Sequence, residues 1–275
     1  MAGDNTRYNV PFRAPALPYP PKMYDAKSFE DFNKILRIYF NQLDNALRNA
    51  MAVQEPYELQ VSKGQIAGAT SLYKFGFNSD VDGTEETIWS SGGNVPWPTA
   101  AFTAYAVSDN AADNGTSTTG AQTLQIEGLD ADYNIKAVSV TLDGTTAVAI
   151  SGTWIRINRV FVALSGSGGT AAGTVTIRNA GASVTYATIS TGNQTQMAVY
   201  TVPAGYTLYL DDISFTAALS IASKNVTVKF VLRNFGSNTF RTGIIETIQS
   251  NSLLVPFQYP LAIAEKTDVE CRAFS

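Results

Sequence analysis

The chain has 275 residues, of which 15% are charged, and its net charge is −4. It contains no histidine, which excludes Ser-His-Asp and Cys-His catalysis and histidine-ligated zinc. Its single cysteine, Cys271, excludes an internal disulfide and is expected to be a buried or half-buried strand thiol. The absence of a basic run argues against nucleic acid or an anionic membrane as partner. A polar opening and no apolar run of about 20 residues predict neither a signal peptide nor a membrane span, so we expect a soluble cytosolic product.

Residues 1–27 combine prolines with aromatic residues. Because proline lacks an N–H and fixes φ, the segment is expected to form neither a helix nor a central strand. Its aromatic residues are too frequent for a purely disordered tail. We therefore predict an extended arm that becomes ordered on a neighbouring subunit, with a flexible leader as the alternative. The side chains expected to anchor the arm are Tyr8, Phe12, Leu17, Tyr19 and Tyr24.

Residues 28–52 are predicted to form an amphipathic helix that begins at Ser28, with Asp31 completing a variant capping box. Apolar residues recur there at alternating spacings of three and four, which is the pattern of a coiled-coil seam. Further apolar residues at Ile35, Phe40 and Leu47 widen the seam, which favours three or more helices, with packing on the chain's own β body as the alternative. We predict a homotrimer. The oligomerisation residues are Phe29, Phe32, Leu36, Tyr39, Leu43 and Ala46.

Residues 56–275 alternate apolar and polar residues between Gly, Asn, Asp and Ser turns. Strands are predicted from 58–62 and 70–77 onward, and their spacing indicates an antiparallel β-sandwich, with a jelly roll as one possible form. The strongest local signal is a hairpin from Lys136 to Ile150 around Asp143-Gly144. The polar loops 108–120 and 165–173 are expected to be exposed.

No motif in the chain predicts catalysis, and no cofactor is expected. Close pairs of acidic residues occur at Asp80/Asp82, Glu85/Glu86, Asp130/Asp132 and Asp211/Asp212, but neighbours in a loop do not supply the two facing carboxyls that a glycosidase needs. Asp80, Asp82 and Glu85 form a weak candidate for calcium binding, although Asp and Gly are equally typical of a tight turn, so we predict no metal site. The tryptophans Trp89, Trp97 and Trp154 could form a carbohydrate platform, but core packing is the more common role.

Five segments resemble known phage proteins. Residues 17–49, with the sequence LPYPPKMYDAKSFEDFNKILRIYFNQLDNALRN, are similar to the N-terminal motif of virion structural proteins of tailed phages, especially those that infect marine bacteria and cyanobacteria. Residues 73–93 (YKFGFNSDVDGTEETIWSSGG), 146–177, 195–210 and 260–274 resemble a widespread family of phage structural proteins. This family is known mainly as virion components and offers no catalytic residues for transfer.

The resemblance implies a non-enzymatic virion protein that is assembled in the host cytoplasm. One hypothesis is a capsid decoration, cement or head-fibre subunit, whose partner is the major capsid protein. The other is a tail-fibre or tail-tip component, bound to a tail or portal-associated protein and recognising a host surface glycan through loops 108–120 and 165–173. A long fibre normally shows repeats or a longer coiled coil, so we favour the head. An enzyme such as a depolymerase is disfavoured, because no β-helix repeat is present.

Overall fold

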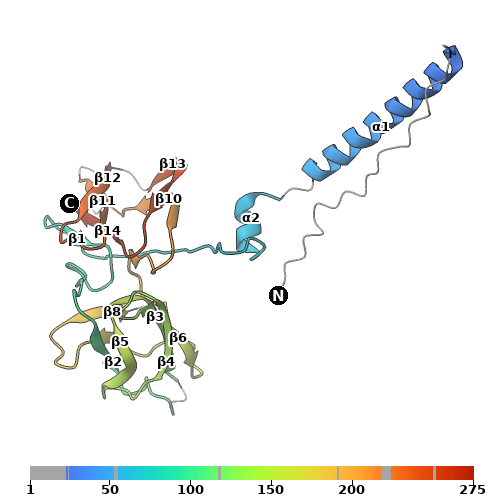
Figure 1. The fold of residues 1–275 in the computed structure, drawn as a ribbon. Coiled ribbons are helices and arrows are strands. Elements are labelled where there is room, and N and C mark those ends of the chain that lie inside the picture. The colour runs from blue at the N-terminus through green and yellow to red at the C-terminus, as the bar shows by residue number, and fades with distance from the viewer. Residues whose placement is uncertain are drawn as a thin grey trace. The chain divides into compact units, whose positions relative to one another are not determined.

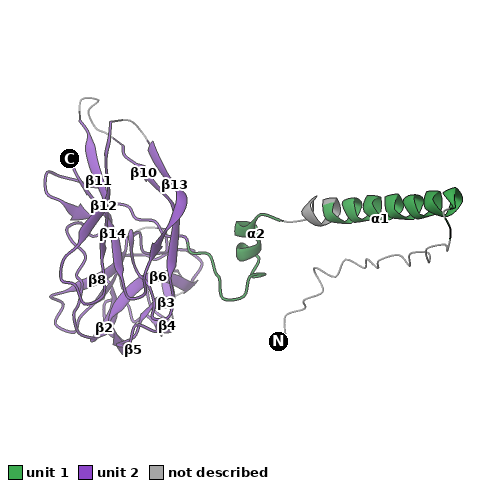
Figure 2. Cartoon of the chain, turned by 45° about the horizontal axis from the view of Figure 1, so that its top comes forward, with its two compact units in different colours: residues 1–72 green, residues 73–275 purple. Residues whose placement is uncertain are grey.

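The computed structural model divides the chain into two compact units, residues 1–72 and 73–275 (Figure 2). It describes residues 23, 25–52, 55–116, 119–190, 192–218, 224–249 and 252–275, with backbone alone for 48–52. Most of the predicted arm, including its five anchoring side chains, therefore lies outside the described residues.

Helix α1 spans Ala26–Ala52 (Figure 1), and Asp25 caps it. The Asp25 carboxylate accepts hydrogen bonds from the amides of Lys27 and Ser28, each at 3.2 Å, and from the Ser28 hydroxyl at 2.7 Å. These bonds, led by the one from the Ser28 hydroxyl, lower the pKa of Asp25. The predicted start at Ser28 was thus wrong by two residues, because Asp25 supplies the acceptor that the first turn requires.

A second, short helix, α2, spans Tyr57–Ser62, where the sequence predicted a strand at 58–62. Pro56 precedes it with φ of −49°, and the Ser62 hydroxyl donates to the carbonyl of Glu58, one turn earlier, at 2.9 Å. The predicted strand at 58–62 was wrong because the Pro56 carbonyl accepts the first helical hydrogen bond, from the Gln60 amide at 3.1 Å, and so short a run does not define a period. The predicted strand at 70–77 is also absent, and the compact β body begins at Tyr73 instead of residue 56.

The second unit is mainly antiparallel β structure, as predicted, and contains two separate sheet pairs (Figure 1). Within the described residues, the first pair consists of a four-stranded sheet in the order β5-β2-β7-β8 and a three-stranded sheet in the order β4-β3-β6. One core joins the two sheets, and Trp154, Leu124 and Ile177 are among its most buried side chains. The strands are β2 (Phe102–Ser108), β3 (Ala121–Leu129), β4 (Ile135–Thr141), β5 (Val148–Trp154), β6 (Arg156–Ser165), β7 (Val175–Arg178) and β8 (Thr185–Ile189).

In the second pair, the described residues form a five-stranded sheet in the order β1-β14-β11-β12, with β9 also paired to β14, and a two-stranded sheet of β10 and β13. Two smaller apolar clusters, around Phe230 and around Phe215, lie between these sheets. The β-sandwich prediction is therefore confirmed, in the form of two sandwiches within one unit. The strands are β1 (Glu86–Thr87), β9 (Val199–Thr201), β10 (Leu208–Thr216), β11 (Val226–Arg233), β12 (Arg241–Ile248), β13 (Ser252–Ile263) and β14 (Asp268–Phe274).

The predicted hairpin around Asp143-Gly144 was wrong in its pairing. A turn does form, in which Thr146 N–H donates to Asp143 C=O at 2.9 Å and Gly144 has φ of +57°. However, β4 pairs with β3 and β5 pairs with β2, so the chain passes from one sheet to the other at this turn. Turn composition identifies where the chain reverses, but it does not determine which strand becomes the partner.

Candidate functional site

A carboxylate that is almost fully buried, that of Asp268 at 3% exposure, lies at the start of β14. Its Oδ1 and Oδ2 accept from Nε and Nη2 of Arg156 at 2.8 and 2.9 Å, a bidentate pair. Arg233 donates to Oδ2 from Nε at 3.1 Å and from Nη2 at 2.6 Å, and the Thr201 hydroxyl donates to Oδ1 at 2.5 Å. Arg156 belongs to the first sandwich, whereas Asp268, Arg233 and Thr201 belong to the second.

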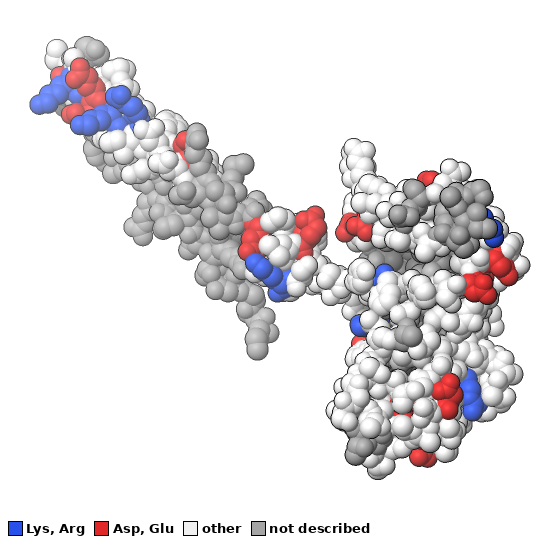
Figure 3. Space-filling view, turned by 180° about the vertical axis from the view of Figure 1, so that it is seen from behind, with Lys and Arg blue, Asp and Glu red and all other residues white. Residues whose placement is uncertain are grey.

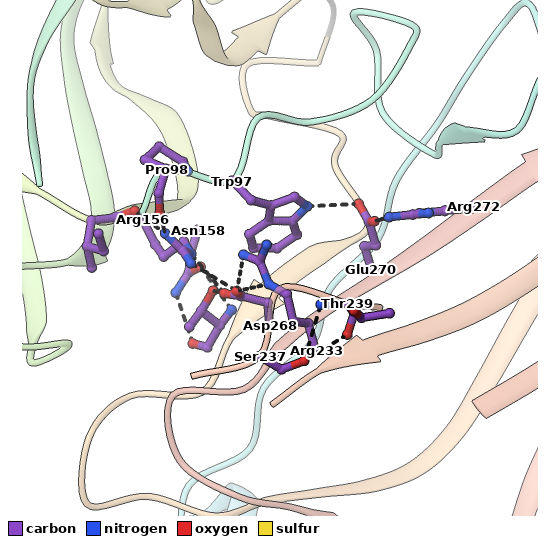
Figure 4. Close-up of polar contacts among 12 residues, drawn as sticks. Trp97, Pro98, Arg156, Asn158, Arg233, Ser237, Thr239, Asp268, Glu270 and Arg272 are labelled. Atoms are coloured by element: carbon purple, nitrogen blue, oxygen red, sulfur yellow. Dashed lines mark hydrogen bonds and ion pairs between the residues drawn. The ribbon is translucent and has the colours of Figure 1, made fainter. Parts of the chain in front are cut away.

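Trp97 connects the ion pairs around Asp268 to a second buried carboxylate, that of Glu270 (Figure 4). The guanidinium carbons of Arg156 and Arg233 lie 5.2 and 5.4 Å from the Trp97 ring centroid, within cation–π range. The Trp97 indole N–H donates to Glu270 at 3.3 Å, and Thr87 donates to the same carboxylate oxygen at 2.9 Å. The tryptophan thus takes part in the contact between the two sandwiches.

Glu270 and Glu85 share Arg272 at the far end of the network. Arg272 donates from Nε to Glu270 at 2.5 Å and from Nη1 to Glu85 at 3.0 Å, and Lys229 also pairs with Glu85. Burial raises the pKa of Glu270, although Arg272 acts in the opposite direction. The hydrogen bond from Lys229 is the main reason why the pKa of Glu85 is lowered.

The network contains three carboxylates and four cationic side chains, and each carboxylate oxygen accepts at least one hydrogen bond. Opposite charges paired in this way compensate for one another's burial, and every carboxylate oxygen is already engaged within the protein. We therefore interpret the network as the element that fixes one sandwich against the other. We call this network the clasp; its residues are Glu85, Trp97, Arg156, Lys229, Arg233, Asp268, Glu270 and Arg272.

The candidate calcium residues are not gathered into one site. Glu85 is part of the clasp, whereas Asp80 is exposed and Asp82 accepts from the Thr84 amide at 2.6 Å, as in an ordinary turn. Among the residues that the structure describes, no group of three acidic or cysteine side chains is placed to hold a metal ion. The Asp and Gly residues of this segment are therefore explained as residues of a turn.

Two of the three tryptophans and the cysteine take the structural positions that were expected, whereas Trp97 belongs to the clasp. Trp154 and Trp89 are buried in the first core, at 0% and 4% exposure, which agrees with core packing. Cys271 lies half-buried in β14. Burial, assisted by the negative charge of Glu270, raises the pKa of its thiol to about 12, so the thiol stays protonated and poorly nucleophilic.

Asp113 is a buried residue that the sequence analysis did not single out. Its carboxylate accepts from the Ser108 hydroxyl at 2.6 Å and from the amides of Ala121, Ala172 and Gly173 at 2.7, 2.7 and 2.9 Å. Burial opposes ionisation, but the hydrogen bonds outweigh it and lower the pKa of Asp113. The two loops that were expected to be merely exposed, 108–120 and 165–173, are therefore fastened to each other at one point.

The predicted oligomerisation residues lie along α1 and none is buried. Phe32, Leu36, Tyr39, Leu43 and Ala46 are half-buried and Phe29 is 56% exposed. Phe40 and Leu47, which widen the seam, are 59% and 54% exposed. No residue between Asp25 and Leu47 is buried, so this helix presents a continuous apolar stripe.

Neither the family models nor the curated proteins include a match to this chain. Among the described residues, no helix combines the length and the apolar character needed to cross a membrane.

Replacing Asp268 by alanine should destabilise the body by about 3–5 kcal/mol, because Arg156 and Arg233 would lose the charge that compensates their burial. Urea unfolding followed by tryptophan fluorescence measures the change, and the exposed Asp211→Ala is the matched control. Equal midpoints for the two variants would show that the clasp does not hold the sandwiches together.

Replacing Asp113 by asparagine should cost about 1–3 kcal/mol, since an amide cannot accept from every donor that surrounds the carboxylate. Because folding lowers this pKa below its ordinary value of 3.8, the stabilisation is present above pH 3.8 and is lost as the pH falls through the folded-state pKa. The stability difference from wild type should therefore shrink in acid. The exposed Asp132→Asn is the control, and a difference that does not change with pH would contradict the assignment.

Proposed function

We propose that this chain is a non-enzymatic structural subunit of a phage virion, most consistent with a capsid decoration, cement or head-fibre protein. The observation that carries the proposal is α1, a helix of 27 residues with large apolar side chains left exposed, in a unit distinct from the β body. The resemblance of residues 17–49 to virion proteins supports the same assignment.

The exposed stripe of α1 gives a physical reason for self-association. Burying side chains such as Phe29, Phe40 and Leu47 contributes about 1.5–3 kcal/mol each. The heptad positions place Phe40 and Leu47 beside the seam formed by residues such as Leu36 and Leu43, and a widened seam favours three helices over two. The proposed assembly is therefore a homotrimer joined through α1.

The β body presents a surface suited to protein contacts. Charged atoms are sparse on the face shown in Figure 3, with wide uncharged areas between them. The sheet of β10 and β13 exposes Tyr209, Leu254 and Tyr259 at 64%, 61% and 79%. Interface centres are depleted in charge and enriched in aromatic residues, so this sheet is the proposed contact with neighbouring virion proteins.

A tail-fibre or tail-tip role is the second candidate, and Asp113 is the observation that favours it. By fixing loops 108–120 and 165–173 to each other, Asp113 gives this end of the first sandwich a defined surface. Recognition sites often consist of loops held by a rigid scaffold. The head assignment ranks first because a long tail fibre normally has a longer coiled coil than α1 could form.

Glutamate substitutions at Leu36 and Leu43 should convert the trimer into monomers, because they place charges in the seam that the proposed trimer would bury. Light scattering after gel filtration of the full-length protein gives the mass directly. Ile38→Glu is the matched control, since Ile38 is 49% exposed and lies off the seam, and this variant should stay trimeric. A wild-type monomer at micromolar concentration would overturn the proposal of self-association.

A chain that begins at Asp25 should retain its helix cap and its cooperative unfolding, yet fail to enter virions. The reason is that residues 1–24 hold the predicted anchoring aromatics, whose docking is favoured by prolines that already restrict the backbone. Particles assembled with either form are purified and compared by immunoblotting. Equal incorporation would place the anchor in α1 or in the β body instead.

A further inference from the structure

An open cleft of about 480 Å³ lies on the first sandwich, and none of its lining residues belongs to the clasp. Part of its lining comes from β7 and β8, which form one edge of the four-stranded sheet. The segment 89–96 supplies the rest of the lining together with the turn that precedes β8. The Ser91 hydroxyl attaches this segment to β8 by a hydrogen bond of 2.6 Å to the Thr188 hydroxyl.

The lining of the cleft contains no charged side chain. It offers hydroxyl and amide groups beside apolar surface from Pro96 and Val184, while Trp89 lies buried beneath. The side chains of Asn94, Thr176 and Thr185 have no hydrogen-bond partner among the described residues, so their donors and acceptors are available to a ligand. Thr176 lies opposite Thr188 in the register of β7 and β8, which places two hydroxyls side by side.

The segment that borders the cleft is held in place by several bonds. The Trp89 indole N–H donates to the carbonyls of Gly92 and Gly93 at 2.8 and 3.0 Å, which closes a tight loop. The buried carboxylate of Glu86 accepts from the Gly93 amide at 2.6 Å, and the Thr87 hydroxyl accepts from the Val95 amide at 3.1 Å. A loop fixed in this way loses little further entropy when a ligand binds.

We propose that this cleft binds a neutral carbohydrate of one or two sugar units. Hydroxyl and amide groups both donate and accept, which matches the hydroxyl groups of a sugar, whereas an ionic ligand would find no opposite charge in the lining. The volume lies within the roughly 300–1,000 Å³ that is typical of small-ligand sites. The inference goes beyond the proposed virion role and does not depend on it.

The test is saturation-transfer NMR on the full-length protein, with glucose, galactose, mannose, N-acetylglucosamine, lactose and cellobiose as probes. At least one of these neutral sugars should give a saturable signal, while sialic acid, a charged sugar, should give a weaker one. Thr176→Val and Thr185→Val each remove one hydroxyl with little change of shape, and each should weaken binding about two- to twelvefold. Thr103→Val, an exposed position on β2 of the same sheet that does not line the cleft, is the matched control.

The variants must first show the melting temperature of wild type, so that a loss of signal reports on the cleft. The proposal is overturned if no neutral sugar binds, or if binding is unchanged in both threonine variants. It is also overturned if Thr103→Val weakens binding as much as they do. These results are independent of the light-scattering mass and of the incorporation into particles. The carbohydrate proposal and the virion proposal can therefore be contradicted separately.

Discussion

The contact between Asp268 and Arg156 is the constraint on which the arrangement of the β body depends. It joins residues 112 positions apart, one from each sandwich, with Asp268 at 3% and Arg156 at 5% exposure. A buried ion pair of this kind adds little net stability compared with a well-packed apolar contact, because desolvation of the charges is costly. Its main consequence is specificity, since any other placement of the sandwiches would leave buried charges without partners.

The two faces of β14 explain how the clasp coexists with an ordinary core. Successive side chains of a strand point to opposite sides, so Asp268, Glu270 and Arg272 share one face and Val269, Cys271 and Ala273 share the other. The charged face meets Trp97 and Arg156, whereas the apolar face packs into the two smaller cores. One strand therefore serves both the packing of its own sandwich and the junction with the other.

The strands of the body could be predicted from the sequence because alternation is a local signal, and most predicted ranges lie close to observed strands. The pairing of β4 and β5 could not, since the Asp143-Gly144 turn reports only on its neighbours. Asp113 and Asp268 were missed for the same reason, as their partners lie up to 60 and 112 residues away. For Asp268, the signal in the sequence was the alternation of acidic and apolar residues at 268–271. This alternation indicates that charge lies on one face of a strand, but it does not indicate which cation the charge meets.

The proposal that this chain is a virion subunit, built around the apolar stripe of α1, is tested most directly by counting its copies in purified particles. Quantitative mass spectrometry against the major capsid protein gives that ratio. A decoration, cement or head-fibre protein should be present in large numbers, on the order of hundreds of copies per particle when trimers occupy repeated sites on a symmetric shell. Absence from purified particles would contradict the account, and a dozen or so copies would replace the head assignment with the tail.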